Sequence, residues 1–102
     1  AYWSALRQMR AEFAALTAPF DAVIMPTSPI LPPHVQRLLD DAEYYKAENL
    51  LGLRNTRIGN LMDLPALSLP TGTPSCGIML CGHTGQDDRL LRVGVAAETA
   101  LR

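Results

Sequence analysis

The chain is 102 residues long, 48% of them apolar and 19% charged, which excludes a disordered tail and limits the chain to one hydrophobic core. Its formal charge of -1 at pH 7 excludes a basic surface for nucleic acid. No apolar run approaches the ~18 residues that cross a bilayer, so no membrane partner is expected. No export signal is recognisable, and we therefore expect a cytoplasmic protein with reduced cysteines.

The first predicted element is an amphipathic helix from Tyr2 to about Leu16. Its apolar residues recur at steps of three and four, at Trp3, Leu6, Met9, Phe13 and Leu16. The pattern is already established at Trp3 and no capping residue comes before it. Because a helix normally begins with such a cap, we expect the chain to be cut from a longer one at Ala1.

A short strand is predicted next, at 22–25, between Asp21 and Pro26. The run is continuously apolar, which is typical of a strand covered on both faces. Residues 27–33 contain three prolines, and these favour an extended loop that leaves the C-terminal end of the strand. Loops at that end of a strand often line binding sites.

Two helices are predicted after the proline loop. The first runs from Val35 to about Tyr45. The second follows an apolar spacing from Leu50 toward Met62, although Gly52 lies inside it and weakens the pattern.

Two further strands are predicted, at 66–69 and 77–81, joined by a Gly/Pro turn. The turn is too short for a parallel crossover, so these strands should be antiparallel if they are neighbours. The first strand of the chain precedes the second by about forty residues with helix, so those two can run parallel. The predicted fold class is therefore α/β, with a mixed sheet of about three strands and flanking helices.

A final helix is predicted after the third strand. Thr84 is the expected N-cap, with Asp87 three residues further on. The expected buried stripe consists of Leu90, Val93, Ala97 and Leu101. No internal repeat or low-complexity segment appears, so residues 1–102 are expected to form a single domain.

A metal site is the first candidate for chemistry, because thiolates and imidazole are the ligands that zinc prefers. Cys76, Cys81 and His83 lie close together in the sequence. Side chains alternate along a strand, so Cys81 and His83 share a face while Cys76 points to the other. The only other histidine is the distant His34, and no metal site or nucleotide cofactor is expected.

A serine and lysine pair is the second candidate. The chain has a single lysine, Lys46, in a polar stretch from Glu43 to Asn49, where a solvated surface lysine is expected. The available serines are Ser4, Ser28, Ser68 and Ser75. No catalytic residue is assigned.

Polar residues that precede the second strand allow two interpretations. Asn55 and Asn60 could line a substrate pocket. Alternatively, Asn60 or Asp63 bonds backbone groups in the turn before Pro65. For Asn60 and Asp63 the second interpretation is favoured.

Four stretches follow one another in a recognisable order. An Asp-led strand ends in Pro-Thr at Phe20–Thr27, and an Asn-x-x-x-x-Pro approach to a strand lies within Asn55–Pro70. The apolar strand Gly77–Leu80 follows a Gly/Pro turn, and Gly85–Leu91 leads into an Ala-rich helix. In this order they resemble the C-terminal part of the amidase-signature family. The resemblance covers nearly the whole chain, but only a minor C-terminal share of a family enzyme, and it therefore implies that residues 1–102 are a single partial domain.

The resemblance implies amide hydrolysis by a serine nucleophile, helped by a second serine on a cis peptide and by a lysine, with no metal or organic cofactor. In the family those residues belong to an upstream Gly/Ser-rich region, which this sequence lacks. What the resemblance implies here is a wall of the acyl pocket, formed by Thr27 and Ser28 together with Leu53 and Arg57, while Asn60 shapes the turn. Arg57 could then pair with a polar or acidic substrate.

Within the family, the run Asn55–Arg57 looks nearest to linear-amide and mandelamide-type amidases. Allophanate hydrolases and the glutamyl-tRNA amidotransferase A subunits are further off.

The leading hypothesis is therefore the C-terminal portion of an amidase, inactive without the rest of the enzyme, with a small amide as the substrate of the whole. The alternative is a non-catalytic module that forms a homodimer or complements a partner through an apolar surface and free strand edges. A truncated product without a function of its own is the third possibility.

Overall fold

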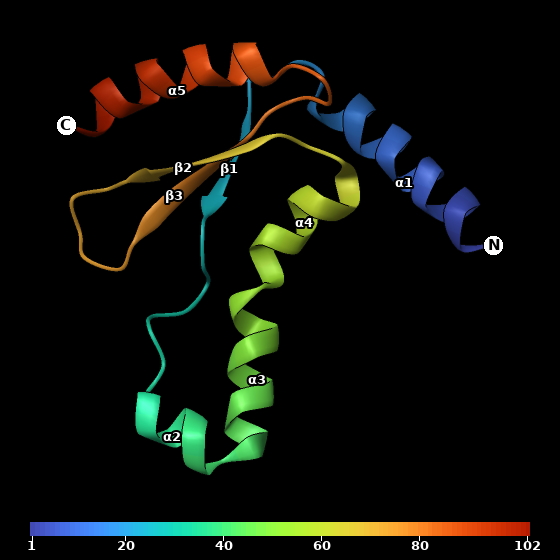
Figure 1. Ribbon diagram of the computed structural model, residues 1–102. Coiled ribbons are helices and arrows are strands. Elements are labelled where there is room, and N and C mark those ends of the chain that lie inside the picture. Colours follow the sequence, from blue (N-terminus) through green and yellow to red (C-terminus); the bar gives the residue numbers. More distant parts are fainter.

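A three-stranded sheet lies at the centre of the computed structural model, which describes residues 1–102 (Figure 1). The strands are β1 (Val23–Pro26), β2 (Ala66–Pro70) and β3 (Gly77–Cys81). Their order in the sheet is β1-β3-β2. With five helices around this sheet, the prediction of an α/β fold with about three strands and flanking helices is confirmed.

The pairing within the sheet differs from the mixed arrangement that was expected. β1 and β2 run in the same direction, but β3 lies between them, so both ladders are antiparallel. The reason is the composition of β3. Residues 78–81 of β3 form a continuous apolar run, and such a strand is most stable in the middle, where both edges are paired and both faces are covered.

The five helices are α1 (Tyr2–Thr17), α2 (Val35–Asp40), α3 (Ala42–Gly52), α4 (Arg54–Met62) and α5 (Asp87–Leu101). Figure 1 shows α5 lying along one face of the sheet, α1 projecting to one side, and α2 to α4 forming an arm that extends away from the strands. None of these helices combines the length and the hydropathy that crossing a bilayer requires.

The middle helices divide differently from the prediction. The helix expected at 35–45 is interrupted at Asp41, whose carboxylate accepts the backbone N–H groups of Glu43 and Tyr44 and so begins α3. The helix expected from Leu50 is also divided, because Leu53 separates α3 from α4. Three helices therefore replace the predicted two.

Helix α5 packs on β2 and β3 through part of the predicted stripe: Leu90 is buried and Val93 and Ala97 are half-buried, whereas Leu101 is exposed. Gly94 lies so close to Leu67 that a Cβ on Gly94 would overlap the leucine side chain. The predicted N-cap is wrong: the helix begins after Gln86, and the Thr84 hydroxyl instead donates to the Asp63 carbonyl at 2.8 Å. The chain turns once more at Gly85, whose φ is +76°, before the helix can start.

The core of the chain is small. Only 10 of the 102 residues are buried. The six hydrophobic residues among them are Leu6, Met62, Met79, Leu80, Cys81 and Leu90. The Cα radius of gyration is 16.0 Å, compared with about 13 Å for a compact domain of this length. The chain is therefore open in shape.

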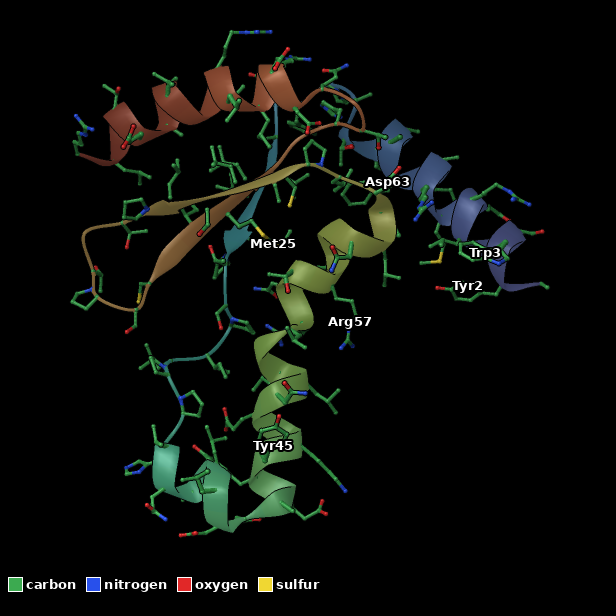
Figure 2. All side chains as sticks on the ribbon, in the orientation of Figure 1. Tyr2, Trp3, Met25, Tyr45, Arg57 and Asp63 are labelled. Carbon is green, nitrogen blue, oxygen red and sulfur yellow. The ribbon has the colours of Figure 1, made fainter.

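The open shape leaves exposed some apolar residues of β1 and α1. β1 was expected to be covered on both faces, but Ile24 is 64% exposed because α5 covers only its neighbours β2 and β3. In the predicted stripe of α1 only Leu6 is buried, and Trp3 is 65% exposed. Tyr2 and Trp3 lie at the free N-terminal end of α1, apart from the sheet (Figure 2).

Candidate functional site

The loop after β1 is fixed to the sheet and to α4 by three hydrogen bonds. The Asn55 side chain donates from Nδ2 to the Pro26 carbonyl at 2.8 Å. The Thr27 N–H donates to the Gly77 carbonyl at 3.0 Å. The Thr27 and Ser68 hydroxyls bond each other at 2.5 Å. These contacts join β1, β2, β3 and α4 at the point where the loop begins.

Gly77 makes this junction possible. A Cβ at this position would lie 3.1 Å from the hydroxyl oxygens of both Thr27 and Ser68, closer than the ~3.5–4.0 Å at which carbon contacts are most favourable. A side chain there would push the two hydroxyls apart. The requirement for glycine is therefore one of space between neighbouring strands.

A groove of about 430 Å³ lies between this loop and α3, and we call it the α3 groove. Ile30, Leu31, Pro32 and Pro33 form one wall. The other wall is a helical stripe with spacings of three and four residues. The members of this stripe are Tyr45, Glu48, Asn49, Gly52 and Leu53. The groove falls within the size range of small-molecule sites.

A second hollow, of about 540 Å³, lies on the other side of the loop. It is bounded by β1, the start of β3 and the turn between β2 and β3. Ser28, Ile30, Leu31 and Ser75 line both spaces. The loop after β1 is therefore a wall of two hollows at once.

The structure brings together two of the four residues predicted to bind substrate. Ser28 and Leu53 line the α3 groove from opposite walls. Thr27 does not line the groove, because its hydroxyl is bonded to Ser68. Arg57 is exposed and projects from the side of α4 that faces away from the loop (Figure 2).

Three polar residues of the α3 groove were missed in the sequence. Glu48 and Asn49 belong to the α3 stripe, and Ser75 adopts a left-handed backbone with φ of 62° in the turn before β3. The stripe itself was visible, since Tyr45, Glu48 and Gly52 recur at helical steps. A search for apolar positions alone passes over it, because two of its five members, Glu48 and Asn49, are polar.

Asn55 and Asn60 have different roles in the structure. Asn55 is buried and holds the loop, so it lines no hollow. The turn before Pro65 is closed by the backbone of Asp63, whose φ is 58° and whose N–H donates to the carbonyls of Asn60 and Gly59. The turn was predicted at the right place, but it is the backbone of Asp63 that forms it.

No serine and lysine pair is formed within the chain. Lys46 is exposed and pairs with Glu43 at 3.6 Å on the same helix. Ser28 forms a local turn, accepting from the Ile30 N–H and donating to the Ile30 carbonyl. Neither residue is placed for nucleophilic chemistry with the other.

The cysteines and histidines are dispersed, and no group of three or more His, Cys, Asp or Glu side chains is close enough to hold a metal ion. The His83 ring bonds the Phe20 carbonyl through Nε2 at 2.7 Å, which requires a proton on that nitrogen. Cys81 is buried in β3, whereas Cys76 is exposed in the preceding turn.

The two thiols should therefore differ in reactivity. We expect iodoacetamide to modify Cys81 at least about tenfold more slowly than Cys76 in the folded chain, because burial hides the sulfur and raises the pKa of the Cys81 thiol. Timed labelling followed by peptide mass spectrometry measures the two rates. In urea the rates should converge, and equal rates without urea would contradict the central position of β3.

Comparisons with a family model and with individual proteins point to the same family. The amidase family model matches residues 3–91. The A subunit of glutamyl-tRNA(Gln) amidotransferase from Halobacterium salinarum is 31% identical over 105 residues, which cover 95% of this chain and 24% of that protein. The A subunit from Thermus thermophilus is 36% identical over 99 residues, covering 92% of this chain and 20% of that protein.

A relative that is named for a different activity is similar to this chain over nearly its whole length. The 2-amino-5-chloromuconic acid deaminase of Comamonas testosteroni is 31% identical over 102 residues, which cover 94% of this chain and 20% of that protein. The chain thus spans about a quarter or less of the length of these relatives. No solved structure gives a significant match. Since the family model covers most of its length, the chain belongs to the amidase family.

Proposed function

We propose that the chain is the C-terminal segment of a serine-dependent amidase, which hydrolyses amide C–N bonds and takes its catalytic residues from the rest of the enzyme. The observation that carries the proposal is the match to the amidase family over residues 3–91 in a chain that spans 24% or less of its relatives. The chain would then supply a three-stranded part of the sheet and one wall of the substrate pocket. Its location would be cytoplasmic, and no cofactor is implied.

The amount of exposed surface supports this proposal. A compact monomer of 11.1 kDa exposes about 5,700 Å², whereas this chain exposes 7248 Å². The excess is comparable to the surface that one partner contributes to a large obligate interface, on the order of 1,000–2,500 Å². The rest of an amidase would cover it, including the exposed Trp3 and Ile24.

The predicted substrate contacts take different forms in this proposal. Ser28 and Leu53 would line the wall of the acyl pocket from the α3 groove. Thr27 would act by holding the loop in place through its bonds to Ser68 and Gly77. Arg57 lies outside the α3 groove, so it would contact substrate only if the rest of the enzyme forms a pocket wall next to this side of α4.

The subclass of amidase is a finer proposal. The run Asn55–Arg57 favours a linear-amide or mandelamide-type substrate. None of the relatives described above is named as a linear-amide or mandelamide-type amidase, so this preference rests on the sequence resemblance.

Amide hydrolysis tests the proposed function directly. We expect the chain alone to be inactive, because Lys46 is engaged with Glu43 and no serine is activated. The chain joined to the Gly/Ser-rich catalytic portion of its own amidase should release ammonia from a small amide, measured in a coupled assay. Turnover by the chain alone would contradict the proposal, as would the absence of turnover from the joined protein when that protein is folded.

The second candidate is a non-catalytic module that self-associates. It is favoured by the same exposed apolar surface and by the free outer edges of β1 and β2. Sedimentation of the isolated chain separates the candidates. A stable dimer that does not dissociate when the catalytic portion is added supports the module, whereas exchange of the dimer for a one-to-one complex supports the amidase.

A further inference from the structure

The α3 groove carries a single charged side chain, Glu48. We propose that the groove binds a small molecule with an apolar body and an N–H donor group, and that Glu48 selects this molecule against carboxylates. The proposal deepens the proposed function, since it names the class of substrate group that the segment would recognise.

The apolar part of the proposal rests on the walls of the groove. Ile30 and Leu31 face Leu53 across the space, and Tyr45 supplies an aromatic ring at the α3 side. Gly52 brings the α3 wall close to the loop, since a Cβ at this position would lie 3.6 Å from the end of the Ile30 side chain, at ordinary contact distance. A volume of about 430 Å³ accommodates a phenyl ring with a short polar group.

The proposal that the groove binds an N–H donor rests on the unpaired carboxylate of Glu48. This half-buried carboxylate forms no ion pair, and no side-chain hydrogen bond occupies it. The two nearest cations along the sequence are engaged elsewhere: Lys46 pairs with Glu43, and Arg54 donates from Nε to the Asn55 Oδ1 at 3.4 Å. Glu48 is therefore free to accept N–H groups from a ligand.

The remaining polar groups of the groove are neutral. Asn49 contributes an amide and Ser75 a hydroxyl, and no Arg or Lys lines the space. An ammonium is attracted to the carboxylate, a primary amide donates to it, and a carboxylate is repelled. Arg57 does not line the groove, so it supplies no cation to a ligand bound there.

This selection has a consequence for a hydrolysis. In a serine-dependent hydrolysis the serine displaces the amine, which takes up a proton and leaves, and water then releases the acyl group from the serine. The acyl product is therefore a carboxylic acid, which ionises to a carboxylate. The product has then lost its N–H donors and carries a negative charge beside Glu48. Glu48 would favour the amide over the acid and help the acid to leave.

Three probes of matched size test the proposal: phenethylammonium, phenylacetamide and phenylacetate. The full chain, labelled with ¹⁵N, is titrated with each probe, and the backbone amide shifts of Glu48, Gly52 and Leu53 report binding in the groove. Affinities in the millimolar range are expected for ligands of so few atoms. We expect phenethylammonium to bind about tenfold more tightly than phenylacetate, because attraction and repulsion by one half-buried charge act together, with phenylacetamide between them.

Two variants make the test specific. Glu48→Gln should bring the three affinities within about threefold of one another, because the amide keeps the shape and removes the charge. Glu43→Gln removes the same charge from the same helix outside the groove and should preserve the native order.

Three results would overturn the proposal. They are phenylacetate binding as tightly as phenethylammonium, equal effects of the two variants, and no shift of the groove amides with any probe in the folded chain. Binding needs no catalytic serine, so these results are independent of the hydrolysis test. Failure of hydrolysis with the native order of binding intact would reject the amidase proposal and leave the groove as a binding site.

Discussion

Leu90→Ala is expected to lower the free energy of unfolding by about 2–5 kcal/mol, because it leaves a cavity between α5 and the sheet. Leu90 is only 4% exposed and is one of six buried hydrophobic residues. A loss of this size is a large part of the stability of a small domain, about 5–15 kcal/mol. Urea unfolding followed by circular dichroism measures the change.

Leu91→Ala is the matched control, since it makes the same substitution one residue further along the same helix. Leu91 is 57% exposed, so its replacement in the isolated chain should change the stability by less than about 0.5 kcal/mol. Equal losses for the two variants would contradict the orientation of α5. A loss at Leu91 that appears only in the complete enzyme would show that the rest of the amidase packs on this face.

Asn55→Ala is expected to destabilise the chain by about 1–3 kcal/mol, because it leaves the Pro26 carbonyl without its partner at a site where water has little access. Asn55 is 8% exposed, and its Nδ2 lies 2.8 Å from that carbonyl oxygen. The variant should also release the start of the loop, with faster hydrogen exchange at the Thr27 N–H. Urea unfolding and hydrogen exchange measure the two effects.

Asn60→Ala serves as the control within the same helix. Asn60 is exposed, and its side chain forms no hydrogen bond, so a change of a few tenths of a kcal/mol is expected. Helix propensity alone would make both changes slightly stabilising, since Ala is a better helix former than Asn. If Asn60→Ala were as harmful as Asn55→Ala, the loss at Asn55 could not be assigned to its bond with Pro26. Unchanged exchange at Thr27 in Asn55→Ala would argue against its role in holding the loop.

The elements of this fold were largely predictable from the sequence because their signals are local. The helical spacing of Leu6 and its neighbours predicts α1, and Leu90 marks the correct face of α5. The turn before Pro65 was also predicted at the right place. The division of the middle helices was missed because the capping carboxylate of Asp41 was not weighed against the apolar pattern.

Burial and the site were less predictable, because both depend on segments that are distant in sequence. The apolar run of β1 predicts cover on both faces, yet Ile24 is 64% exposed within this chain. Thr27 and Ser68 meet only because β3 brings β1 and β2 to either side of itself. Glu48 becomes a groove residue only because the loop folds back along α3.

The central position of β3 also determines when the sheet can form during synthesis. β1 and β2 are both made before β3, and neither pairs with the other. At about 5–20 residues per second, β1 leaves the ribosome several seconds before its only partner strand exists. Until Gly77–Cys81 has emerged, the backbone N–H and C=O groups of β1 and β2 that will pair with β3 must remain bound to water or to a chaperone. The exposed apolar side chains of β1 stay without their partner strand for the same time.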